Sequence, residues 1–231
     1  MIKNTFNTNV PHYNCSEGHK ICFPFSPPIF QTELDKEFVN ELLVEGRKLK
    51  IDEDDWSPRL AGNFKSGRSF IYKEDYVKKI EPQIVKQAEN FFNGLYESHG
   101  EGYSGINKLM RKPIDRNNSV YGQLKLDTMW INFQHKHDFN PPHTHAGVLS
   151  FVIYLQVDEK IFKTQADSNT KEAGKIIFQY GEEMSEIVGN MWPVYPYTGL
   201  MFMFPARLKH HVPSYWIDNE RISVSGNLIV T

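Results

Sequence analysis

The chain has 231 residues, of which 40% are hydrophobic and 23% are charged, a composition typical of folded globular proteins. It excludes a disordered, collagenous or coiled-coil chain. The formal net charge of −2 argues against a nucleic acid or an anionic membrane surface as the main partner. Two cysteines are too few for a disulfide scaffold, and no apolar run is long enough to span a bilayer. We therefore expect one cytoplasmic domain over residues 1–231, with no membrane partner.

The first 115 residues are predicted to be a mostly helical support region. Residues 1–30 contain several Pro, Asn and Ser residues and predict an irregular or edge-strand segment. The sequence Thr32–Asp35 has the form of a capping box, and apolar residues follow it at helical spacing. A second amphipathic helix is expected from about residue 73, with an interruption at Pro82 and an end at Gly100.

Residues 116–231 are predicted to form the β-rich core that carries the site. The period of the apolar residues changes there from 3.6 to 2, and segments 128–134, 148–157 and 221–230 each have one apolar and one mixed face. A sheet with such faces is covered by helices on its apolar side and lines an interior with its mixed side. We therefore predict a mainly β fold, a double-stranded β-helix of the cupin-like jelly-roll type, with N-terminal α-helices packed on the outer sheet.

The nine histidines are unevenly distributed. His143 and His145 are two positions apart, so on an extended strand both imidazoles point to the same side. His210 is well placed in the sequence to supply a third ligand to the same metal ion. Three ligands on one face leave positions open for a cosubstrate and oxygen, as in non-haem Fe(II) oxygenases.

The histidines belong to an ordered set of motifs. The set is H-x-H at 143–145, G-K-I-I-F at 174–178, F-P at 204–205, H-x-V at 210–212 and R-x-S at 221–223. It resembles the Fe(II)- and 2-oxoglutarate-dependent dioxygenases. With M-W-I-N at 129–132, it looks like the 2-oxoglutarate oxygenase group found in marine bacteria and tailed phages. The resemblance covers at least residues 120–231, and L-A-G-N at 60–63 looks similar too.

The resemblance implies roles for individual residues. His210 matches the distal iron ligand, and Arg221 matches the basic residue that holds the distal carboxylate of 2-oxoglutarate. An arginine suits this task because its planar fork meets a carboxylate bidentately and stays charged. Ser223 belongs to the same R-x-S motif. Five further residues complete the candidate site: Tyr154 beside the same carboxylate, Asn132 and Gln134 at the other end of the cosubstrate or at the substrate, and His143 with His145 at the metal.

The activity that the resemblance implies is an oxygenation. Fe(II), 2-oxoglutarate and O2 would be consumed in oxidising, most simply hydroxylating, a C–H bond of a second substrate, while the protein supplies orientation and a dry pocket. As that substrate we rank a protein or peptide side chain first and a small metabolite second. A nucleobase comes third because the chain is not basic.

The iron ligands differ from the usual pattern, because most members of the family carry H-x-D where this chain has His145. Three interpretations remain open. The favoured one is a three-histidine centre of His143, His145 and His210. In the second, His145 is taken with Gly147 in the place of the acid, as in oxygenases that use only two histidines and let water fill the gap. In the third, Asp138 or Asp127 supplies the carboxylate.

Two rival functions are a three-histidine cupin-type dioxygenase that does not use 2-oxoglutarate and a non-catalytic, metal-binding jelly-roll protein. Arg221 and Ser223 argue against the first, because such an enzyme needs no clamp for a distal carboxylate. A closed tetrahedral metal site would support the second.

Several other polar residues have open interpretations. His135 and His137 are either solvated loop residues or substrate contacts, and Arg207 either faces an anionic substrate or lies on the surface. The set His12, Cys15, His19 and Cys22 could form a zinc site, but its spacing is unlike that of common zinc motifs, so we favour a role without metal.

Overall fold

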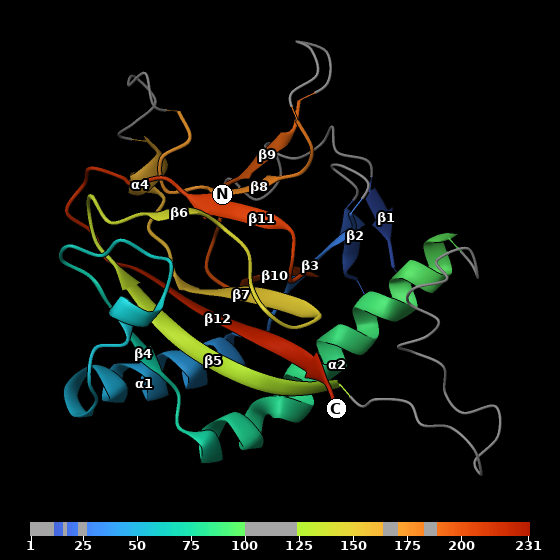
Figure 1. Ribbon diagram of the computed structural model, residues 1–231, viewed down its shortest axis with the longest axis horizontal. Helices are drawn as coiled ribbons and strands as arrows, with labels where there is room; N and C mark the ends of the chain where they lie inside the picture. The colour runs from blue at the N-terminus through green and yellow to red at the C-terminus, as the bar shows by residue number, and fades with distance from the viewer. Residues whose placement is uncertain (1–11, 16–17, 23–26, 100–123, 164–170, 183–188) are drawn as a thin grey trace.

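Two antiparallel sheets face each other in the computed structural model, which describes residues 12–15, 18–22, 27–99, 124–163, 171–182 and 189–231 (Figure 1). The large sheet has the strand order β1-β2-β3-β10-β7-β12-β5-β4 and the small sheet the order β6-β11-β8-β9. The strands of the large sheet are β1 (His12–Asn14), β2 (Lys20–Cys22), β3 (Ile29–Glu33), β4 (Arg68–Ile71), β5 (Leu124–Gln134), β7 (Leu149–Gln156), β10 (Leu200–Pro205) and β12 (Arg221–Val230). Those of the small sheet are β6 (Asn140–His143), β8 (Ile176–Gln179), β9 (Met191–Val194) and β11 (Lys209–Val212).

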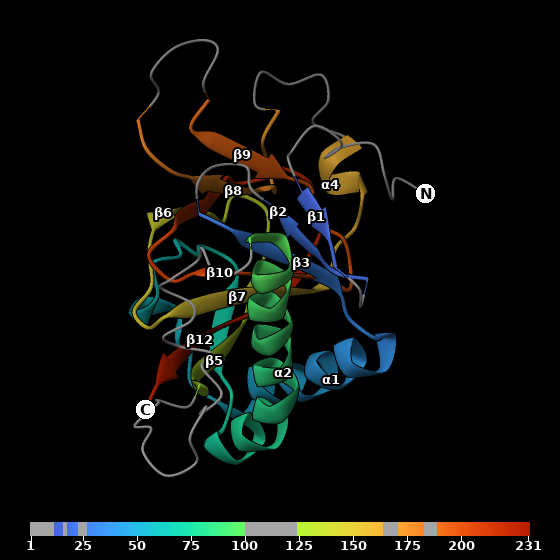
Figure 2. The same ribbon diagram turned by 90° about the vertical axis from the view of Figure 1, so that its right-hand side faces the viewer.

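Two long helices, α1 (Lys36–Asp52) and α2 (Glu74–His99), cover the outer face of the large sheet (Figures 1 and 2). Their apolar residues, such as Leu42 and Ile84, share one buried cluster with Ile131, Ile153 and Val224 of the sheet. A second buried cluster fills the space between the two sheets and is rich in aromatic rings. The predicted mainly β jelly roll with helices on its outer sheet is therefore confirmed, and alternation along the strands decides which side chains face inward.

The predicted capping box is wrong. Thr32 and Glu33 belong to β3, where Thr32 pairs with Met201 of β10, and α1 begins only at Lys36. The residue before the helix, Asp35, makes no side-chain capping bond. Strand pairing within the large sheet therefore prevails over the local sequence pattern, which predicts a helix start at these residues.

The predicted interruption at Pro82 is also wrong, because α2 is one helix through this residue. A proline inside a helix removes one backbone hydrogen bond. Ile80 and Ile84 on either side of it are buried in the cluster under the large sheet. This packing compensates for the lost bond and keeps the helix continuous.

The N-terminal half supplies strands as well as helices. β1, β2 and β3 extend one side of the large sheet, and β4 closes the other side by pairing with β5. β4 has only four residues, two of them Arg68 and Ser69, so its sequence has no apolar run that predicts a strand. The remaining short elements are the 3-10 helix η1 (Ser57–Arg59) and α4 (Lys160–Lys163). Within the described residues, none of the helices has the length and hydropathy needed to cross a membrane.

Candidate metal centre

His143, His145 and His210 meet at the inner face of the small sheet. His143 ends β6, His210 lies on β11, and the two are direct partners in the strand register. His145 follows β6 in a loop that is held by a hydrogen bond from its backbone N–H to the carbonyl of Ala206, at 2.8 Å. The ligand atoms of the three imidazoles lie within 4.8 Å of one another, and this trio is the one such group of His, Cys, Asp and Glu found among the described residues.

Hydrogen bonds from the rings orient two of these imidazoles. Nδ1 of His143 lies 2.7 Å from the carbonyl oxygen of Pro141, and Nδ1 of His210 lies 3.0 Å from that of Leu208. A carbonyl only accepts, so each Nδ1 carries the proton and each Nε2 keeps a free lone pair. Nε2 of His145 is 3.2 Å from Nε2 of His210. Two imidazole nitrogens bound to one metal at about 2.1 Å, at a right angle, would be about 3 Å apart, so the trio fits a metal ion.

All three imidazoles are neutral at pH 7. Burial lowers the pKa of His143, and burial together with His143 lowers the pKa of His145 to about 4. The pKa of His210 is held well below its usual value, mainly by burial and then by the neighbouring histidines. Neutral imidazole is the form that binds a metal. The site is therefore ready to accept an ion without first losing protons.

The geometry does not favour the two alternative iron shells. Gly147 does not line the cavity at the histidines, and a side chain there would meet the carbonyl of Leu228. Asp127 is exposed on β5. Asp138 is fully buried, but its carboxylate accepts backbone N–H bonds from Lys65, Ser66, Gly67 and His135, at 2.7–3.1 Å. Because both carboxylate oxygens of Asp138 accept these hydrogen bonds, Asp138 is a clamp that joins two loops and is not a metal ligand.

A cavity of about 250 Å³ opens at the histidines, and Arg221 lines it from β12. Arg221 is only 3% exposed and donates from Nη1 to the carbonyl of Gly174 at 2.7 Å. Its buried Nε has no hydrogen-bond partner, and neither does the hydroxyl of Tyr154, which is fully buried beside it. Among the described residues, no carboxylate pairs with Arg221. A buried guanidinium without a counter-ion is costly, so an anion such as a carboxylate of 2-oxoglutarate fits here.

The other predicted cosubstrate residues divide into two groups. Ser223 and Asn132 line the same cavity, because Ser223 pairs with Tyr154 on one side and with Asn132 on the other. Gln134 is not among the cavity residues. Its side-chain amide donates to the backbone carbonyl of Asp138 at 2.7 Å and thereby holds the turn after β5. The strand alternation places Gln134 inward, but its side-chain amide is hydrogen-bonded to the turn that follows β5 and does not reach the cavity.

One wall of the cavity comes from the segment between the two helices. The sequence by itself does not predict most of the residues in this wall. Arg59, Leu60, Ala61, Gly62 and Phe64 line the cavity mouth. Asp138 ties the end of this segment to the β5–β6 turn, and Asn63 forms a β-bridge with Phe139. The L-A-G-N resemblance marks part of this wall, but no local pattern indicates that Arg59 or Phe64 reaches the site.

The remaining polar candidates lie elsewhere. His135 contacts Glu220 at 3.3 Å and His137 is exposed, and neither lines the cavity. Arg207 is exposed and also outside it. Burial raises the pKa of Cys15 to about 11 and that of Cys22 to about 12, and no metal-binding group that includes either one is found in the described part of the chain.

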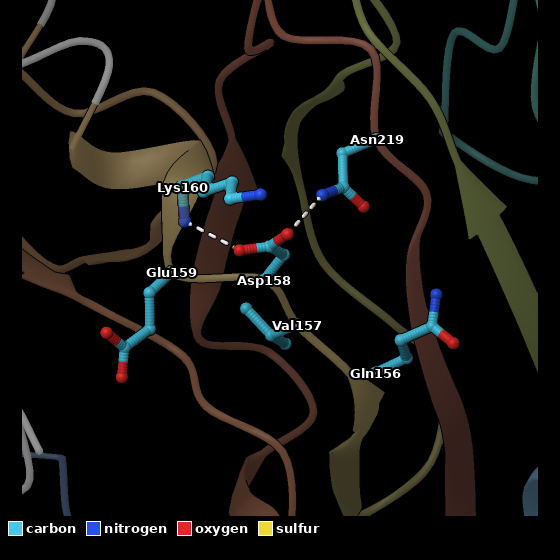
Figure 3. Close-up of a pocket in the computed structure, with 6 residues that line it drawn as sticks. All are labelled: Gln156, Val157, Asp158, Glu159, Lys160 and Asn219. Carbon is cyan, nitrogen blue, oxygen red and sulfur yellow. Dashed lines mark hydrogen bonds between the residues drawn. The ribbon is translucent and has the colours of Figure 1, made fainter.

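A second hollow, of about 510 Å³, lies at the end of β7 and contains no histidine (Figure 3). Within it the carboxylate of Asp158 accepts hydrogen bonds at 2.8 Å from Nδ2 of Asn219 and from the backbone of Lys160. Gln156 donates to the carbonyl of Glu220 at 3.0 Å. These hydrogen bonds hold the loop before β12 against the end of β7, and they thereby help to position the strand that carries Arg221.

The chain is similar to one protein family and to several solved structures. Residues 128–227 match the model of the family "Putative 2OG-Fe(II) oxygenase". The fold is shared with a prolyl-4-hydroxylase of Pseudomonas putida, at 13% identity and a TM-score of 0.51, over 88% of this chain and 93% of that one. The viral collagen prolyl hydroxylase vCPH from Paramecium Bursaria Chlorella virus-1 aligns at 10% identity and a TM-score of 0.49, over 87% and 94% of the two chains. No curated protein sequence matches the chain.

Proposed function

We propose that this Fe(II)- and 2-oxoglutarate-dependent oxygenase hydroxylates a side chain of a protein or peptide at a three-histidine iron centre. His143, His145 and His210 would hold the iron. Arg221 and Tyr154, helped by Ser223, would hold the distal carboxylate of 2-oxoglutarate. When bound, the iron and 2-oxoglutarate supply the activation of O2 that oxidises a C–H bond.

The observation that carries the proposal is the pairing of the histidine trio with an unsatisfied anion site in one cavity. The unpartnered Arg221 Nε and Tyr154 hydroxyl are both buried on the wall of the cavity that His210 also lines. A three-histidine dioxygenase without 2-oxoglutarate has no use for these two groups. A structural metal site would have no need of a cavity next to them.

Residues around the trio and Arg221 have defined tasks in this proposal. The carbonyls of Pro141 and Leu208 keep the proton of each imidazole on Nδ1, so that Nε2 faces the metal. The carbonyl of Gly174 orients the guanidinium of Arg221. The rings of Phe204 and Phe178 pack against His210, with centroids at 4.8 and 6.3 Å, and exclude water from that side.

The size of the cavity favours a side chain over a whole metabolite. Its volume of about 250 Å³ is below the roughly 300–1,000 Å³ of typical small-molecule sites. The iron and 2-oxoglutarate occupy part of that volume. The remaining space admits one side chain or end group, while the rest of the substrate stays outside, as it would for a protein or peptide. A cytoplasmic location is part of the same proposal, and the free thiols of Cys15 and Cys22 support it.

The test is an anaerobic titration of the protein with Fe(II), with and without 2-oxoglutarate, followed by the metal-to-ligand charge-transfer absorption. We expect the band in the wild type and in His211→Ala, whose residue is next to His210 but is not in the trio. We expect its loss in His210→Ala and His145→Ala. Iron binding without the band would favour the three-histidine dioxygenase that does not use 2-oxoglutarate. A band of full strength in His143→Ala would favour the two-histidine shell, in which His145 is taken with Gly147 in the place of the acid.

A further inference from the structure

None of the described residues that line the cavity is acidic. Its described lining includes two charged side chains, Arg59 at the mouth and Arg221 inside, and no Asp or Glu. The resemblance puts an acid at the position of His145, and a histidine supplies no negative charge there. The cavity therefore differs in charge from one with a carboxylate ligand, and the difference affects what binds after 2-oxoglutarate.

The charges of the loaded site do not balance. The two guanidinium groups carry two positive charges, and a ferrous ion adds two more. The two carboxylates of 2-oxoglutarate offset two of these charges. Two positive charges remain, and one of them is that of the exposed Arg59 at the mouth, while those inside the cavity interact more strongly than they would in water. A second substrate that carries negative charge would reduce this imbalance.

Arg59 is held in place to receive such a group. Its guanidinium lies over the ring of Trp56, 4.0 Å from the ring centroid. The backbone beneath it is fixed, because Trp56 N–H donates to the carbonyl of Ser69 at 2.7 Å and Ser69 N–H donates to Ser57 Oγ at 2.8 Å. The nearby carboxylate of Asp55 is already used by Ser57 and Arg68.

Arg59 is exposed, lines the cavity mouth and has no acidic partner among the described residues. A guanidinium that lies over an indole ring still has N–H groups available, and these can form charge-assisted bonds to two oxygens of one anion. Little side-chain entropy is lost when the anion binds, because the stack has already ordered the arginine.

We propose that the second substrate carries an oxyanion, a carboxylate or a phosphate, which Arg59 binds at the mouth while the neighbouring carbon reaches the iron. This inference rests on the proposed function, because it assumes iron and 2-oxoglutarate inside. It narrows the substrate class from any peptide side chain to an acidic or phosphorylated one.

The test measures binding by calorimetry to the anaerobic Fe(II)–2-oxoglutarate protein. The probes are nine-residue Gly/Ser peptides with a central Asp, phosphoserine or Asn. We expect at least one of the two anionic peptides to bind ten-fold or more tightly than the Asn peptide. Arg59→Gln is expected to remove the preference and leave the Kd of 2-oxoglutarate unchanged. Lys65→Gln, which removes an exposed charge from the same segment outside the cavity lining, is expected to keep the preference.

The outcomes separate the two proposals. The charge-transfer band is recorded in the same samples, and its absence would mean that the proposed function has failed. With the band present, equal binding of the three peptides, or binding of none, would overturn the oxyanion proposal. A preference that survives in Arg59→Gln would overturn it too. Preference for phosphoserine or for Asp identifies the source of the oxyanion.

Discussion

Replacing Arg221 by methionine should separate cosubstrate binding from folding. The wild-type side chain is buried, makes one hydrogen bond to Gly174 and has no carboxylate partner in the described part of the chain. Methionine removes a charged hydrogen bond worth about 1.5–3 kcal/mol. It also removes the desolvation cost of the buried charge, which offsets a loss of this size. Without 2-oxoglutarate, the variant should therefore match the wild type in unfolding free energy to within about 1 kcal/mol.

The two proteins should differ once 2-oxoglutarate is added. A ligand at about 100 times its Kd stabilises the folded state by about 2.7 kcal/mol. In a chain of this size 1 kcal/mol raises Tm by roughly 2–4 °C. The anaerobic Fe(II) wild type should therefore gain roughly 5–11 °C with 2-oxoglutarate, and Arg221→Met should gain almost nothing. This comparison requires only differential scanning calorimetry with and without the cosubstrate.

The exposed residue Arg207, which lies outside the cavity, provides the matched control. Arg207→Met should keep the full gain in Tm. Two results would refute the reasoning. One is a gain in Arg221→Met of more than half the wild-type value, which would mean that 2-oxoglutarate is held elsewhere. The other is a loss of more than about 3 kcal/mol in Arg221→Met without 2-oxoglutarate, which would make Arg221 a structural residue.

Three further predictions follow from single groups. Tyr154→Phe removes a buried hydroxyl that has no hydrogen-bond partner. Calorimetry should therefore show unchanged stability and a Kd for 2-oxoglutarate raised by roughly 3- to 10-fold. An unchanged Kd would contradict the assignment of Tyr154 to the cosubstrate carboxylate. Asp138→Asn replaces one accepting oxygen by an NH2 group that faces N–H donors. Urea unfolding should show that the free energy of unfolding falls by about 2–4 kcal/mol. A fall below about 0.5 kcal/mol would refute the role of Asp138 as a clamp. The pKa of His145 in the folded, metal-free protein is lowered from 6.5 to about 4, so the unfolded chain binds more protons between these values. Stability should then fall as the pH drops from about 7 to about 4, by about 2 kcal/mol at pH 5. His145→Gln should weaken this pH dependence in urea titrations, and an equal pH dependence in both proteins would exclude His145 as its source.

Much of the fold was readable because strand alternation is a local property. Met129, Ile131 and Ile153 occupy alternate positions, and the structure buries them together under the helices. The same alternation places Asn132, Tyr154 and Ser223 on the cavity side. The errors lie where a distant partner overrides a local signal, as when β10 pairs with Thr32 and when packing keeps α2 continuous through Pro82.

The sequence by itself determined the candidate ligands and their chemistry, since H-x-H spacing on an extended strand and the R-x-S motif need no knowledge of the rest of the chain. Only the tertiary structure brought His210 to within 3.2 Å of His145, because this requires β11 to pair with β6 across more than sixty residues of sequence. It also decided that Asp138 is a clamp and that Arg59 lies at the mouth. Both depend on a segment far away in the sequence, which the carboxylate of Asp138 fastens to the sheet.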